Sequence, residues 1–258
     1  MRFLLALAMS ALTVQFLVAS GRLALRQELG STARMAVGAV LLVLVLTLTV
    51  YTPVVAFGRV ADIDMARLNL PLLFLGHFVL AAFVLFWWLL RRDPASLTEY
   101  LSLRRHDRAS LLRYGLIAGV SAWLLAIVVN LTIALLLAPV LPASDPLPLP
   151  PIMVWFAGLD FASKLAVVGV AMTVEEAFFR GFLQPRIGIW ASSAMFALGH
   201  FSYGLPFLVV GVFVVSVVLG RVYERTRDLL PCIVGHGVFD ALQLFVVLPL
   251  AVQSASVQ

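Results

Sequence analysis

The sequence predicts an all-α membrane protein, a bundle of about eight transmembrane helices. Of its 258 residues, 62% are hydrophobic and 12% are charged, about half the charged share of a soluble domain. The mean hydropathy is +1.06. The long apolar runs do not alternate with polar residues, which argues against a β-barrel. A lone span must satisfy its own backbone hydrogen bonds, so each should be a helix.

Charged or proline-rich breaks separate the apolar stretches, and a span needs roughly 20 residues to cross the hydrocarbon core. We expect spans at residues 3–19, 35–57, 70–90, 114–138, 153–179, 187–203, 205–220 and 229–250. Segment 3–19 could instead be a cleaved signal peptide. We favour a retained span, because cleavage would leave the arginines of 20–34 on the wrong side of the membrane.

Most arginines fall in alternate loops, at 20–34, 91–113, 180–186 and 221–228. Basic loops stay in the cytoplasm, so both termini should face outward. We expect a multi-pass protein of the cell membrane, in composition typical of a bacterial inner membrane. The net charge of +5 then orients the chain in the lipid bilayer, and we expect no nucleic-acid partner. The lone Cys232 excludes an internal disulfide framework.

Ionisable residues at membrane depth divide the chain, because such residues are costly there and usually functional. Residues 1–150 are mainly apolar and receive no role, and we interpret His77 among them as a packing or hydrogen-bonding histidine. Residues 151–258 carry the chemistry. Glu176 and Arg180 lie four residues apart and can pair, which taken alone is most often structural. Glu175 points about 100° away and can face another partner.

Four ionisable residues of the second half can converge from three helices on one polar pocket. They are Glu175, His200, His236 and Asp240. A carboxylate can take a proton from water while a histidine orients it. A second histidine with a polar neighbour can stabilise an oxyanion. The same four also suit a divalent metal such as zinc, and both chemistries stay open. The HExxH and GxSxG motifs are absent.

Three motifs carry a resemblance to a known family. They are EExxxR at Glu175–Arg180, followed by Gly-Phe-Leu-Gln-Pro-Arg, FxxxH at Phe196–His200, and HxxxN/D at His236–Asp240. In this order, each in its own span, they resemble the CPBP family of intramembrane proteases, also called the Abi or CAAX-protease family, which includes type II CAAX prenyl endopeptidases. The resemblance covers about residues 155–250.

The resemblance implies an eight-helix membrane fold and peptide-bond hydrolysis in a membrane-associated protein substrate, which in eukaryotic members is a prenylated CAAX protein. It implies that Glu175 activates water with His200, that His236 and Asp240 hold the oxyanion, and that Glu176 and Arg180 orient Glu175.

Two departures from the family pattern stand out. The short gap between Glu175 and His200 predicts a tight turn between the fifth and sixth spans. Asp240 replaces the asparagine of the prenyl endopeptidases, and an ionised aspartate would repel an oxyanion. Asp240 must therefore be protonated, point elsewhere or bind a metal, which favours the metal mechanism somewhat.

Two other functions compete with an endopeptidase of glutamic or metallo type. A non-enzymatic membrane scaffold or bacteriocin-immunity-type protein could retain the fold. A proton-coupled transporter could relay protons through the buried residues, but such transporters often have repeated halves, and these halves are chemically unlike. We favour the endopeptidase, because a scaffold has no evident need for the complete set of ionisable residues.

Overall fold

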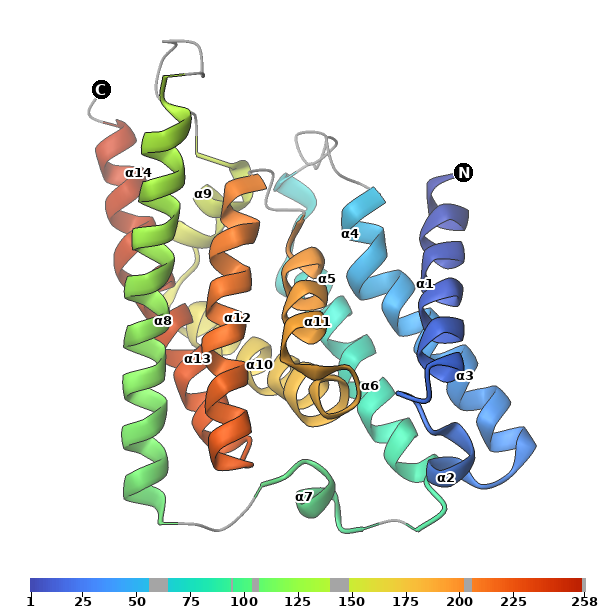
Figure 1. The fold of residues 1–258 in the computed structure, drawn as a ribbon. Coiled ribbons are helices and arrows are strands. Elements are labelled where there is room, and N and C mark those ends of the chain that lie inside the picture. The colour runs from blue at the N-terminus through green and yellow to red at the C-terminus, as the bar shows by residue number, and fades with distance from the viewer. Residues whose placement is uncertain (56–64, 94, 104–106, 140–148, 202–205, 257–258) are drawn as a thin grey trace.

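A computed structural model describes residues 1–55, 65–93, 95–103, 107–139, 149–201 and 206–256 (Figure 1). Helices make up nearly all of these residues, and no strand occurs among them. The predicted all-α fold is confirmed.

The first part of the chain forms a series of helices joined by short connections. They are α1 (Arg2–Ala19), α2 (Leu25–Leu29), α3 (Thr32–Leu46), the π-helical turn η1 (Thr47–Tyr51), α4 (Thr52–Val55), the 3-10 turn η3 (Met65–Arg67), α5 (Leu70–Leu73), α6 (Leu75–Leu90), α7 (Leu97–Tyr100) and α8 (Arg108–Leu137). Helix α1 packs on α3 and η1, and the buried Ser10 and Thr47 hydroxyls hydrogen bond between them at 2.9 Å.

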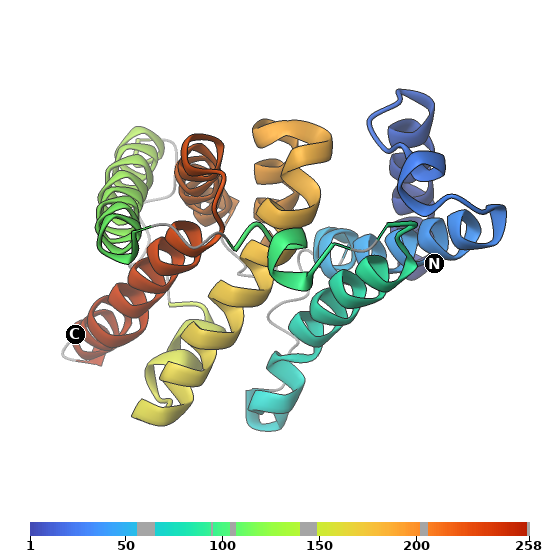
Figure 2. The same ribbon diagram turned by 90° about the horizontal axis from the view of Figure 1, so that it is seen from below.

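The second part begins with two helices that bend sharply against each other. It comprises α9 (Pro151–Ala157), α10 (Phe161–Glu176), the π-helical segment η4 (Ala177–Leu183), α11 (Gln184–Gly199), α12 (Pro206–Thr226), α13 (Leu230–Leu242), the π-helical turn η6 (Gln243–Val247) and α14 (Leu248–Ser256). Helix α10 lies between α13 and α6, as the end-on view shows (Figure 2).

The predicted span at 153–179 is wrong in its bounds. It is broken, and the two helices on either side of the break bend by 117°. The break occurs because Asp160 caps a new helix, its carboxylate accepting from the Ser163 amide at 2.9 Å.

The predicted turn at 180–186 is also absent, because the helix continues from α10 through η4 into α11. The change of direction comes at Gly188 instead, where φ is 82°, a conformation that favours glycine.

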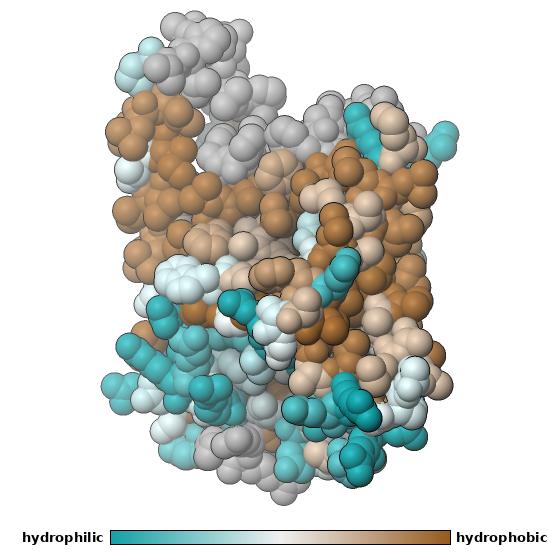
Figure 3. Space-filling view, turned by 45° about the vertical axis from the view of Figure 1, so that its right-hand side comes forward, coloured by the Kyte–Doolittle hydropathy of each residue, from teal (hydrophilic) through white to brown (hydrophobic). Residues whose placement is uncertain are grey.

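Four helices in the described residues are long and apolar enough to span a membrane, or five if the bent pair counts as one span. They form a multi-pass membrane bundle. The total number of spans, expected to be about eight, remains a prediction. Hydrophilic residues gather at the end that carries α2 and α7, below a broad hydrophobic band (Figure 3). The termini lie at the opposite end. The assignment of the hydrophilic end to the cytoplasm remains a prediction.

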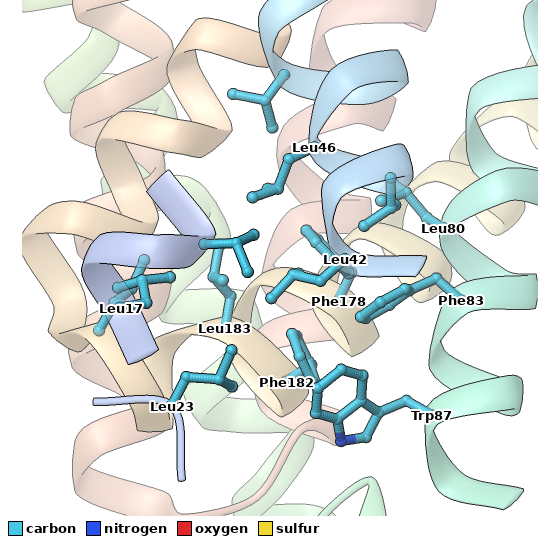
Figure 4. Packing of buried hydrophobic residues seen from close by; sticks show 14 of the residues in the cluster. Leu17, Leu23, Leu42, Leu46, Leu80, Phe83, Trp87, Phe178, Phe182 and Leu183 are labelled. Atoms are coloured by element: carbon cyan, nitrogen blue, oxygen red, sulfur yellow. The ribbon is translucent and has the colours of Figure 1, made fainter. Parts of the chain in front are cut away.

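An aromatic cluster fastens η4 to α6. Phe178 and Phe182 of η4 face Phe83 and Trp87 of α6 (Figure 4). The Phe182 ring lies 4.8 Å from that of Phe83 and 4.9 Å from that of Trp87. Such pairs stabilise by about 0.5–1.5 kcal/mol each beyond their burial. The segment that directly follows Glu175 and Glu176 is therefore fixed to a helix from the first half of the chain.

Helix α13 is held by close contact with α8. A Cβ atom on Gly119 would lie 2.5 Å from the Gly235 carbonyl, and one on Gly115 would lie 2.6 Å from the Val234 side chain. Small residues allow this approach between membrane helices. Helix α8 belongs to residues 1–150, yet it packs along α12 and α13 of residues 151–258. The division of roles at residue 150 remains a prediction.

Candidate active site

Glu175, at the end of α10, faces three imidazole rings from three helices. Its Oε1 atom accepts a hydrogen bond from His77 Nε2 of α6 at 3.0 Å. Its Oε2 atom lies 3.8 Å from His200 Nε2 at the end of α11 and 3.9 Å from His236 Nε2 of α13. The side chain is 10% exposed. The two carboxylate oxygens are thus in different positions: one is hydrogen bonded, and the other faces two rings beyond hydrogen-bonding distance.

His200 ends α11 and is oriented by its own helix. Its Nδ1 lies 2.8 Å from the Phe196 carbonyl oxygen, and because a carbonyl can only accept, Nδ1 carries the proton. The Phe196 ring packs against the imidazole with 4.6 Å between ring centroids. In a neutral ring, the Nε2 atom that faces Glu175 is therefore an acceptor.

Glu176 and Arg180 form a fully buried pair beneath His236. Arg180 Nε lies 3.2 Å from Glu176 Oε2, and neither side chain has exposed surface. His236 Nδ1 donates to Glu176 Oε1 at 3.0 Å. The pair therefore contacts His236 directly, and its role in orienting Glu175 remains a prediction. The helical step of about 100° between consecutive residues sends the two glutamates to different partners.

Asp240 lies one turn after His236 on α13, as the spacing predicted. Its Oδ2 atom is 3.5 Å from His236 Nε2, and its side chain is 20% exposed. Asp240 therefore belongs to the same cluster and does not point elsewhere. The structure brings together all six predicted residues, whose roles in catalysis remain predictions.

His77, predicted to be a packing or interhelical hydrogen-bonding histidine, is also a member of the cluster. Its hydrogen bond to Glu175 joins residues 98 positions apart. A usable signal was present, because His77 is the one histidine at membrane depth in an otherwise apolar half of the chain. An ionisable residue in a span generally has a partner within the bundle.

A protein metal site needs several grouped ligands. Among the described residues, no group of three or more histidine, cysteine, aspartate or glutamate side chains could hold one. Of the four predicted ligands, His236 already uses its Nδ1 atom in the contact with Glu176. The zinc of one alternative remains a prediction.

Comparison with known proteins supports the assignment made from the motifs. Residues 149–242 match the family described as type II CAAX prenyl endopeptidase Rce1-like. The predicted resemblance to the CPBP family of intramembrane proteases is confirmed. The matched segment contains Glu175, Glu176, Arg180, His200, His236 and Asp240. His77 lies outside it.

A second comparison finds a bacterial relative. Over 69 residues, 26% of this chain, the sequence is 41% identical to the uncharacterized protein YpbD of Bacillus subtilis (strain 168). That alignment spans 36% of the length of YpbD. No solved structure gives a significant match to the chain.

Proposed function

We propose that the protein is an intramembrane endopeptidase of the glutamic type, which hydrolyses a peptide bond of a membrane-associated protein. One observation carries the proposal. Glu175 Oε2 accepts no hydrogen bond from the described residues and faces His200 and His236 at 3.8 and 3.9 Å. A buried carboxylate oxygen aimed at two imidazoles is suited to take a proton from a water molecule held among them.

In the proposed reaction Glu175 acts first as base and then as acid. It takes a proton from water as the water oxygen bonds to the scissile carbonyl carbon, and the carbonyl π electrons move onto oxygen. The C–N bond then breaks, and the proton held by Glu175 passes to the leaving nitrogen. The products are a carboxylic acid and an amine, so the atoms of one water are consumed and no oxidant is needed.

His200 orients the water. Because its Nδ1 proton is held by the Phe196 carbonyl, the neutral ring presents Nε2 as an acceptor for the second hydrogen of the water. Two acceptors, Glu175 Oε2 and His200 Nε2, then fix both hydrogens and direct an oxygen lone pair at the substrate.

His236 supplies the positive charge that the oxyanion requires. Protonated on both nitrogens, it donates from Nδ1 to Glu176 and from Nε2 toward the developing oxyanion. Asp240 Oδ2, at 3.5 Å from Nε2, attracts the protonated ring without holding its proton in a short hydrogen bond. In this role Asp240 acts on His236, and the repulsion expected between an aspartate and an oxyanion is offset by the ring between them.

The test is cleavage by the purified full chain in detergent, with a quenched fluorescent prenylated CAAX peptide and its unprenylated form as probes. General-base catalysis contributes roughly 100- to 10,000-fold to a reaction rate. We therefore expect the cleavage rates of Glu175→Gln and His200→Ala to fall at least about 100-fold. Glu224→Gln is the matched control, because that carboxylate pairs with Arg221 on the exposed surface and should cleave like the wild type. A chelator should leave the rate unchanged, and a chelator-sensitive rate would favour the metallo type.

The natural substrate is proposed only by class, so a second assay uses no chosen peptide and looks for cleavage of any membrane protein. Membranes from cells that express wild type or Glu175→Gln are compared for new protein N-termini. We expect a set of N-termini that depends on Glu175. Identical sets from both variants, together with no cleavage of either peptide, would contradict the protease and support a scaffold.

A further inference from the structure

Neighbouring residues hold His77 in place beside Glu175. It lies near the start of α6, just after the break between α5 and α6 at Phe74. The Phe74 ring packs edge-on against the imidazole, with 5.9 Å between ring centroids. Nε2 donates to Glu175 Oε1 at 3.0 Å, and the His77 side chain is 17% exposed. The contact is the only hydrogen bond that Glu175 receives from the described side chains.

We propose that His77 is a positioning residue of the active site, which holds one oxygen of Glu175 so that the other faces His200 and His236. This inference rests on the proposed function and extends it to a residue outside the matched segment 149–242. It also gives the first half of the chain a part in the reaction.

The two carboxylate oxygens of Glu175 are chemically equivalent, and the glutamate side chain rotates freely unless a partner holds it. A donor on Oε1 fixes the plane of the carboxylate and the direction of Oε2. Catalytic groups need placement within about 0.5 Å, which supporting hydrogen bonds provide. In the described structure His77 is the group in hydrogen-bonding distance that can do this.

The backbone on both sides of this hydrogen bond is held in register. Phe83 and Trp87 lie on the same helix as His77, and they pack on Phe182 of η4, the segment that follows Glu175. Phe178 of η4 also packs on Phe83, at 5.5 Å between ring centroids. Helix α6 and the segment that follows α10 are therefore packed directly against each other, and this packing places His77 beside Glu175.

The kinetic test compares three variants of the full chain on the probe peptide. His77→Ala removes the donor, and a misplaced catalytic group costs roughly 100-fold, so we expect kcat to fall by about that factor with KM little changed. His77→Gln keeps an N–H donor and should recover most of the rate. Phe78→Ala is the matched control, because Phe78 is the next residue and 60% exposed. A rise in KM at unchanged kcat, or a glutamine variant as slow as alanine, would overturn the proposal.

A second measurement needs no substrate and separates this proposal from the proposed function. The side chains of ¹⁵N-histidine-labelled protein are observed by NMR, and the His77 signal is assigned by its absence in His77→Ala. Glu175→Gln should shift the His77 Nε2 resonance, and Glu224→Gln should not. An unmoved resonance in Glu175→Gln overturns the positioning role whether or not the protein cleaves. A shifted resonance in a protein that cleaves nothing supports the contact and counts against the protease instead. Thermal melting of each variant excludes misfolding as the cause.

Discussion

Replacing Arg180 with methionine tests whether the buried pair beneath His236 is held by charge compensation. Arg180 and Glu176 have no exposed surface, and their closest atoms are 3.2 Å apart. Arg180→Met fills a similar volume but leaves the Glu176 carboxylate buried with His236 as its remaining partner. Removal of one partner from a buried ion pair costs about 3–5 kcal/mol, because the other charge is left uncompensated. His236 still compensates part of the Glu176 charge, so we expect the free energy of unfolding to fall by about 3 kcal/mol, the lower end of that range.

The assay is reversible unfolding in mixed detergent micelles, titrated with a denaturing detergent and followed by helical circular dichroism. The double variant Glu176→Gln/Arg180→Met removes both charges and keeps a carbonyl oxygen that can accept from His236. It should be more stable than Arg180→Met alone, since neutral replacement of a buried pair is often nearly free of cost. A double variant as unstable as Arg180→Met, or less stable, would refute the charge argument and assign the loss to packing.

The other predictions concern the helix contacts that support the site. Gly119→Ala should lower the free energy of unfolding by about 1–3 kcal/mol, because the new Cβ would lie 2.5 Å from a backbone carbonyl of α13. The control Gly169→Ala, with nothing within 4 Å of its new Cβ, should unfold at the wild-type midpoint. Equal losses in the two variants would contradict the close contact. Phe182→Ala should cost about 3–5 kcal/mol, measured by the same titration, whereas Phe161→Ala, 69% exposed, should cost little. Gly188→Ala meets open space but keeps φ at 82°, so it should lose about 1 kcal/mol to backbone strain, and a gain in stability would show that the bend is not required.

Local spacing was sufficient to predict much of the site. Residues four apart on a helix share a face, and this rule alone paired Glu176 with Arg180 and His236 with Asp240. The same geometry separated Glu175 from Glu176. Composition was sufficient for the fold class, because an apolar chain in lipid has few alternatives to a helical bundle.

The errors come from contacts between residues far apart in the chain. The arginines of 180–186 suggested an exposed turn, but Arg186 pairs with the distant Glu28 at 2.5 Å. Arg180 is buried in the local pair with Glu176 that the spacing predicted. Because each arginine is paired with a carboxylate, both can lie within a continuous helix. Glu28 is 158 residues from Arg186, so no local pattern reveals the partner. The interhelical hydrogen bond of His77 was predicted as one possibility, but its partner Glu175, 98 residues away, could not be.

The position of α10 between α6 and α13 has a consequence for biosynthesis. The imidazole rings around Glu175 belong to His77, His200 and His236. Glu176 accepts a hydrogen bond from His236. A ribosome releases these helices in chain order, so the glutamates enter the bilayer before their final partner has been translated. The cluster around Glu175 is complete only after α13 has packed beside α10. Under the proposed function, a truncated or half-inserted chain lacks His236 as the donor to the oxyanion and is expected to be inactive.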